Sequence, residues 1–276
     1  FELDIFADPK GGHYSRKKAT NLLGFNAPVM FSKEMEKPGF KVLHDSAVDY
    51  LTTTPTLISA LKEIKVWSDK TPSHVPVFIL LEMKDKSPVP LAKKPVQFTR
   101  SLLEGVEKEI LSIFKRHQII TPDSVRGTFK TLREAVLKTG WPSLDSARGK
   151  VMFGLDNGGR IRDMYVAKNP SLQGRLLFAS VGENDPGAAF FKLNDPIRAH
   201  AQIKRLVESG FMVRTRADSD TREARKNDTS RRDKALSSGA QFVSTDYPEP
   251  NKKFSDYSVS FKKRTNFRIN PISGKK

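Results

Sequence analysis

Seven short apolar segments alternate with longer polar or amphipathic segments along the chain. The apolar segments are nearly continuous in apolar residues, as expected for strands that are covered on both faces of a sheet. Between them lie segments whose apolar residues recur at helical spacing. This alternation is typical of a parallel α/β fold. The predicted strands are 1–8, 41–45, 75–84, 150–156, 175–181, 211–218 and 242–248.

Five of the intervening segments are predicted to be helices. In the first of them, Thr54 or Thr56 is a candidate N-cap, because a threonine hydroxyl accepts a hydrogen bond from the first helical turn. The last two helices end in glycine, which commonly stops a helix. The predicted helices are 54–70, 99–117, 131–139, 195–210 and 228–239.

This order of strands and helices favours a TIM-type (β/α) barrel. The sequence has no G-x-G-x-x-G after a strand and no Walker A loop, which argues against a Rossmann or P-loop protein. A (β/α) barrel needs eight strands, whereas the pattern predicts seven and the first begins at residue 1. We therefore expect residues 1–248 to form an α/β barrel that lacks its first strand in this chain, followed by a basic extension over 249–276.

Composition narrows the class of partner. The 276 residues carry a formal net charge of +17, and 37% of them are hydrophobic, which is enough to bury a core. A basic protein associates with nucleic acid, acidic lipid headgroups or phosphorylated substrates, or simply has a solvated basic surface. The absence of cysteine excludes disulfides and thiolate metal sites.

Polar residues gather where the predicted strands end, which is the catalytic edge of a parallel barrel. A single charge at a strand end usually marks the point where the strand meets water, but here several strands share the feature. Glu2 and Asp4 alternate with apolar residues, so both carboxylates lie on one face of the first strand. The polar residues at the strand ends are Glu2, Asp4, His44, Asp45, Glu82, Lys84, Asp156, Arg214, Arg216, Asp218, Ser244 and Asp246.

These residue types point to the chemistry of phosphate esters. Three carboxylates and one nearby histidine, with no cysteine, favour a hard cation bound through oxygen, either Ca²⁺ or Mg²⁺. Such a cation offsets the repulsion between Glu2 and Asp4 and polarises a phosphoryl oxygen. A histidine such as His44 transfers protons near neutral pH. Lys84 and an arginine can hold phosphate oxygens.

Several longer motifs resemble the Ca²⁺-dependent phosphoinositide-specific phospholipase C-like family. The resemblance extends from residue 1 to about 250, and the long final motif and the ELDIFADP/VLHD pair make it specific. The motifs are ELDIFADPKGGHY, VLHD, LLEMKD, SARGKVMFGLDN, AAFFKLNDP and VRTRADSDTREARKNDTSRRDKALSSGAQFVSTDYP.

The resemblance implies a TIM-type barrel that cleaves a phosphodiester with calcium and two histidines. Glu2, Asp4 and Glu82 match the metal ligands of the family. His44 matches the second catalytic histidine, which stabilises the phosphorane and helps to protonate the leaving group. The resemblance further suggests that Lys84, Arg214 or Arg216, and Asp246 bind the substrate or orient a histidine.

One feature of the family is missing from the sequence. Its first strand normally ends in a His-Asn pair, the first catalytic histidine and another metal ligand, and no such pair precedes Glu2. We therefore expect the chain as given to be catalytically impaired.

The expected partners are a phosphodiester lipid and an anionic membrane surface, with no nucleic acid. We expect a monomer, and the resemblance is compatible with secretion. A glycerophosphodiester phosphodiesterase, which shares the barrel, the Glu-x-Asp pair and the His-Asp, is one alternative. A non-catalytic basic module that binds anionic membranes is another.

Overall fold

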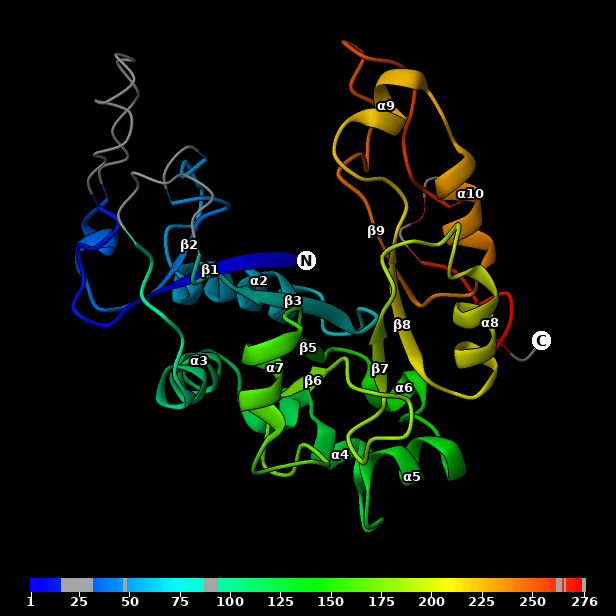
Figure 1. Cartoon of the computed structure of the whole chain (residues 1–276), viewed down its shortest axis with the longest axis horizontal. Coiled ribbons are helices and arrows are strands. Elements are labelled where there is room, and N and C mark those ends of the chain that lie inside the picture. Colours follow the sequence, from blue (N-terminus) through cyan, green and yellow to red (C-terminus); the bar gives the residue numbers. More distant parts are fainter. Residues whose placement is uncertain (16–31, 47–48, 87–93, 262–264, 266, 275–276) are drawn as a thin grey trace. The chain divides into compact units, whose positions relative to one another are not determined.

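The chain folds into two compact units, which we describe one at a time. The first contains Phe1–Val125 and Pro142–Ala179, and the second contains Arg126–Trp141 and Ser180–Lys276. Strands and helices alternate in both units (Figure 1), which confirms the α/β class. The computed structural model describes residues 1–15, 32–46, 49–86, 94–261, 265 and 267–274.

A six-stranded sheet forms the centre of the first unit, in the order β2-β1-β3-β5-β4, with β6 also pairing β5. All its neighbours are parallel except β1 and β2. Its elements are β1 (Glu2–Asp8), η1 (Lys33–Glu36), β2 (Gly39–Val42), α2 (Leu57–Lys70), β3 (Val77–Met83), α3 (Arg100–Ile113), η2 (Arg116–Gln118), β4 (Ile119–Ile120), α6 (Leu144–Ala147), β5 (Val151–Leu155), α7 (Gly159–Val166) and β6 (Leu177–Ala179), and α4 (Pro122–Arg126) lies at the boundary with the second unit.

The second predicted strand is wrong in extent and direction. Instead of a parallel strand over 41–45, β2 covers Gly39–Val42, ends before His44 and runs antiparallel to β1. The chain enters β2 through Gly39, whose φ of +132° is a conformation that residues with a side chain rarely adopt. The direction of β2 determines where His44 lies.

The central strands are buried as their apolar runs predict. In β3, Ile79 and Leu81 are fully buried and Leu80 nearly so, because the strand is covered on both faces. On neighbouring β5, a Cβ added at Gly154 would lie 2.5 Å from the ring of Phe78, so this close packing requires glycine.

Threonine caps set the starts of two predicted helices in this unit. The Thr56 side chain accepts from the Ser59 amide at 3.1 Å, in a capping box that begins α2 at Leu57. The Thr99 side chain caps α3 by accepting from the Leu102 amide at 3.3 Å. Of the two candidate caps for the first predicted helix, the structure thus selects Thr56.

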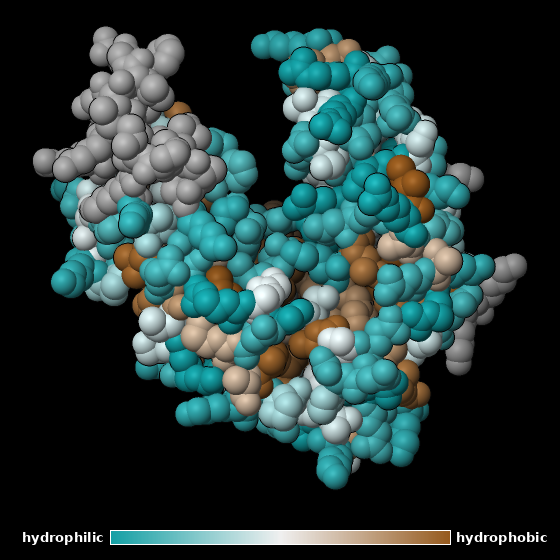
Figure 2. All heavy atoms as spheres, in the orientation of Figure 1, coloured by the Kyte–Doolittle hydropathy of each residue, from teal (hydrophilic) through white to brown (hydrophobic). Residues whose placement is uncertain are grey.

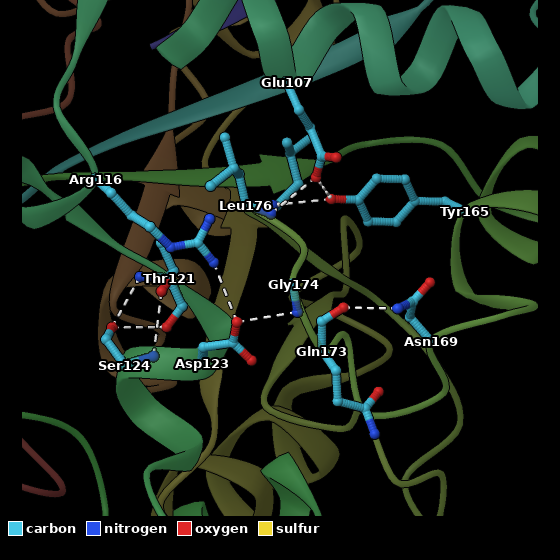
Figure 3. Close-up of polar contacts among 11 residues, drawn as sticks. Glu107, Arg116, Thr121, Asp123, Ser124, Tyr165, Asn169, Gln173, Gly174 and Leu176 are labelled. Carbon is cyan, nitrogen blue, oxygen red and sulfur yellow. Dashed lines mark hydrogen bonds and ion pairs between the residues drawn. The ribbon is translucent and has the colours of Figure 1, made fainter.

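A polar network ties α3 and α7 to the segment that enters β6 (Figure 3). The buried Tyr165 hydroxyl donates to Glu107 Oε1 at 2.6 Å, and the Leu176 amide donates to the same oxygen at 2.8 Å. Arg175 pairs with the other carboxylate oxygen at 3.1 Å. The network compensates each charge that the fold buries here.

The second unit is built on the parallel sheet β7-β8-β9. Part of the predicted extension packs onto this unit, because Tyr257 is 1% exposed and contacts Tyr247 and Ala224. The domain boundary at residue 248 stays a prediction. The elements of the unit are α5 (Leu132–Lys138), β7 (Phe190–Lys192), α8 (His200–Glu208), β8 (Met212–Arg216), α9 (Arg222–Lys226), α10 (Ser230–Ser237) and β9 (Phe242–Ser244).

Two short strands, β4 and β7, are absent from the sequence prediction, because two or three residues carry no periodicity of their own.

Hydrophilic side chains cover most of the face drawn in Figure 2, and apolar ones emerge in small patches. Across the described part of the chain, no helix has both the length and the apolar character of a membrane span.

Candidate metal and phosphodiester site

Three carboxylates meet where β1 and β3 lie side by side. The parallel register places Asp4 beside Glu82, and Glu2 lies two residues earlier on the same face of β1. Each carboxylate offers an oxygen that lies within 4.8 Å of the oxygens offered by the other two. The structure thus brings together the three metal ligands predicted from the sequence.

Lys84 lies against this carboxylate cluster, which we define as Glu2, Asp4 and Glu82. Its Nζ is 3.2 Å from Asp4 Oδ2 and 3.2 Å from Glu82 Oε2. Burial opposes the positive charge of Lys84, but the two carboxylates outweigh this effect and raise the pKa of the ammonium. Lys84 is therefore a cation that already neutralises part of the cluster.

The pKa of Asp4 rises from its ordinary 3.8 to about 6. Burial is the largest cause, and the negative charges of Glu82 and Glu2 add to it, whereas Lys84 acts in the opposite direction. An ionised Asp4 is thus costly in this site without a further cation.

The antiparallel direction of β2 returns the chain to the level of the cluster. The Leu43 amide donates to the Asp4 carbonyl at 3.1 Å, so the next residue, His44, follows directly on this level. The His44 ring bonds to Asp49 through Nδ1, 2.7 Å from Oδ2. Both side chains are well exposed, at 73% and 64%. Asp49 fixes the ring orientation and leaves Nε2 for another partner.

A pocket of about 500 Å³ adjoins these groups. His44, Glu82 and Lys84 line it, together with Asn157 and Arg160 from the segment after β5. It therefore joins a candidate proton-transfer group, a candidate metal ligand and positive charge, as a phosphodiester site requires.

The donor set fits a calcium ion. Ca²⁺ prefers carboxylate oxygens at about 2.3–2.6 Å, so two ligand oxygens on one ion lie at most about 5 Å apart. The carboxylate cluster meets this limit without rearrangement of the strands. It also lacks nitrogen and sulfur donors, which softer metals prefer.

The remaining predicted site residues belong to the second unit. Arg214, on β8, is buried and donates to Asn194 Oδ1 at 2.6 Å. Arg216 ends the same strand and is partly exposed. Asp246 follows β9; its side chain is exposed and its amide donates to Asp218 Oδ1 at 2.9 Å. Their roles in substrate binding stay predictions.

The sequence did not predict Asp49, Asn157 or Arg160 as site residues. Asp49 lies in a loop with no periodic pattern, and a partner for His44 is visible only in three dimensions. Asn157 and Arg160 belong to the run DNGGR, which follows a predicted strand. Polar residues directly after a strand of a parallel sheet are the sequence signal that could have identified Asn157 and Arg160 as site residues.

Comparisons with known proteins agree with this geometry. A family model described as "Phosphoinositide phospholipase C, Ca2+-dependent" matches residues 1–271. The match thus includes most of the basic extension. A search of curated proteins found no significant match.

Solved structures of bacterial enzymes are similar in fold. A Ca²⁺-dependent phosphatidylinositol-specific phospholipase C from Streptomyces antibioticus is 16% identical, with a TM-score of 0.55 over 89% of this chain and 84% of that one. A calcium-dependent phosphoinositol-specific phospholipase C from Pseudomonas sp. is also 16% identical, with a TM-score of 0.51 over 78% and 71%. These similarities confirm the expected TIM-type α/β fold.

Proposed function

Because this chain belongs to the Ca²⁺-dependent phosphoinositide phospholipase C family, we propose that it cleaves the phosphodiester of phosphatidylinositol or a related lipid. Glu2, Asp4 and Glu82 hold the calcium ion. His44, oriented by Asp49, transfers a proton to or from the reacting oxygens. Lys84 holds a phosphate oxygen at the wall of the pocket.

A calcium ion held by these carboxylates would polarise the phosphoryl group and lower the pKa of the attacking hydroxyl, which is either the inositol 2-hydroxyl or water. The protein residues supply the remaining chemistry. His44 Nε2 is directed away from Asp49 and serves as the proton carrier for the leaving oxygen. The Lys84 ammonium offsets negative charge that develops on the phosphate.

The convergence of His44, Lys84 and one member of the carboxylate cluster, Glu82, on one pocket carries this proposal. Such a cluster alone is a common surface feature. Cleavage of a phosphodiester also needs a proton-transfer group, a positive charge and a cavity for the substrate, and His44, Lys84 and the pocket supply them at the same strand ends.

The sequence contains no His-Asn pair, which the family resemblance leads us to expect as the partner of His44. We therefore propose that this chain cleaves its phosphodiester substrate slowly. Added imidazole can substitute for a missing histidine as a general base, so it should accelerate the reaction. Rapid calcium-dependent turnover without imidazole would contradict the proposed impairment.

The test is to incubate the chain with phosphatidylinositol vesicles in Ca²⁺ or in EGTA, with and without imidazole, and to identify the soluble product. A cyclic inositol phosphate that requires Ca²⁺ and is lost in His44→Ala supports the proposal. Glycerol 3-phosphate from a glycerophosphodiester identifies the sister activity instead. The Asp145→Asn variant changes a carboxylate that is 96% exposed and serves as the control.

The net charge of +17 supports attraction to anionic membranes. Co-sedimentation with vesicles that contain phosphatidylserine should weaken steeply as salt is added, because exposed charges are screened. Salt-sensitive binding together with no calcium-dependent cleavage, even with imidazole, would favour the alternative of a non-catalytic membrane-binding module. Secretion and the monomeric state stay predictions.

A further inference from the structure

Glu82 and Lys84 follow the last backbone pair between β3 and β5. That ladder ends at the pair Leu81 and Leu155. On the other edge of β3 the ladder to β1 extends as far as Met83, and the Lys84 amide donates to the Ile5 carbonyl at 2.8 Å. Successive backbone amides of a strand point to opposite edges, so the β5 edge of this segment needs another partner.

The segment 156–160, which follows β5, supplies that partner. The Asp156 amide donates to the Leu81 carbonyl at 2.8 Å. The Asn157 side chain then continues the pattern: its Oδ1 accepts from the Met83 amide at 2.8 Å, and its Nδ2 donates to the Met83 carbonyl at 3.0 Å. One carboxamide thus replaces the next step of a backbone ladder.

Arg160 adds a contact two residues further along the chain from Met83, at Asp85. Its guanidinium bonds to the carboxylate of Asp85, which is 6% exposed, and donates to the Phe98 carbonyl at 3.0 Å. The turn between Asn157 and Arg160 passes through Gly159, whose φ of +54° lies in the left-handed region. Segment 156–160 therefore contacts residues 81, 83 and 85 in turn.

We infer that Asn157 is a positioning residue of the calcium site, which acts through the backbone of Met83 on Glu82 and Lys84. The inference rests on the proposed role of Glu82 as a calcium ligand. With Asn157 in place, the end of β3 is hydrogen-bonded on both edges, so the carboxylate keeps its place beside Asp4. Without it, the end is held on the β1 edge alone, and calcium binding has to order the strand end.

The experiment compares Asn157→Ala with Asn169→Ala. Asn169 is also half-buried and also bonds a backbone carbonyl, that of Gln173 at 2.7 Å (Figure 3), but it lies after α7 and does not line the pocket. Each variant is measured by calorimetry with Ca²⁺ alone, by thermal unfolding, and by hydrogen exchange at the Met83 amide. The last measurement needs neither calcium nor substrate.

We expect Asn157→Ala to weaken Ca²⁺ affinity by about tenfold, the size typical for groups that support metal ligands, and to accelerate exchange at Met83. We expect Asn169→Ala to lower thermal stability similarly while both other readouts stay at wild-type values. Unchanged Ca²⁺ affinity in Asn157→Ala, or an equal loss in Asn169→Ala, overturns the inference.

A second variant covers the case in which Asn157→Ala does not fold. Asn157→Leu keeps the shape of the side chain but loses both the acceptor for the Met83 amide and the donor to its carbonyl, so exchange at Met83 should exceed that of wild type. Equal exchange overturns the inference. If wild type binds no Ca²⁺, the calcium role assigned to Glu82 is wrong and this positioning role is overturned with it. Exchange at Met83 then still shows whether Asn157 holds the end of β3.

Discussion

Replacement of Asp4 by asparagine should stabilise the calcium-free protein while it removes the response to calcium. In the absence of calcium, the Asp4 carboxylate is mostly buried beside two other carboxylates, and its pKa is raised to about 6. Asparagine has the same shape as aspartate, stays neutral and can still accept a hydrogen bond from Lys84. A residue needed for binding is therefore unfavourable for the stability of the calcium-free fold.

The size of the effect follows from the pKa difference. A carboxyl whose pKa is higher in the folded than in the unfolded chain favours folding at low pH, and this contribution is lost as the pH rises. For Asp4, a rise from 3.8 to about 6 corresponds to about 3 kcal/mol at pH 7.5 and about 1 kcal/mol at pH 4.5. The unfolding free energy of Asp4→Asn should exceed that of wild type by these amounts.

The assay is urea unfolding of both proteins in EGTA at the two pH values, repeated in Ca²⁺ at pH 7.5. A ligand at a hundredfold its Kd stabilises by about 2.7 kcal/mol, so calcium should raise the unfolding free energy of wild type and leave Asp4→Asn unchanged. A lower unfolding free energy for Asp4→Asn than for wild type in EGTA at pH 7.5 would refute this prediction. A full calcium response in the variant would refute it equally.

Three further predictions test other parts of the molecule. Asp49→Asn should reduce turnover by about tenfold or more through loss of His44 orientation, and shift the unfolding free energy by no more than about 0.5 kcal/mol because both side chains are exposed; equal turnover would contradict the role of Asp49. Burial raises the pKa of Glu109 to about 7, so this carboxyl stabilises the fold at low pH and contributes about 2 kcal/mol, after allowance for solvent exposure, to the stability that wild type loses between pH 5 and pH 8. Chemical denaturation of Glu109→Gln should lack that contribution, and an identical pH dependence would refute it. Tyr257→Phe removes hydroxyl contacts to the Ala217 carbonyl at 3.0 Å and to Asp218 at 3.2 Å, which should cost about 1–2 kcal/mol in urea unfolding; no loss would show that this part of the basic segment is not integral to the second unit.

Local patterns account for the parts of the fold that the sequence predicts. The apolar run of β3 identifies a doubly covered strand, and the hydroxyl of Thr56 identifies the start of a helix, because both signals act within a few residues. The direction of β2 cannot be predicted from such local signals. Strand residues have the same preferences in either direction, and only pairing with β1 decides that the chain reverses before His44.

The same distinction holds for the site. Glu2 and Asp4 could be predicted as a pair because a spacing of two places them on one face of a strand. The addition of Glu82 required the family resemblance and is matched by the register of β1 and β3. The positioning role of Asn157 could not be predicted, because its partner is the backbone of Met83, which offers the same groups whatever residue stands there.

Calorimetric titration of Ca²⁺ into wild type and into Glu82→Gln is the most direct test of the central claim. Glu82 comes from a different strand than Glu2 and Asp4, so its loss tests the assembled site and not the strand pair alone. We expect one bound Ca²⁺ per chain in wild type and an affinity lower by about tenfold or more in Glu82→Gln. Equal affinity in the two proteins, or no binding to wild type, would contradict it.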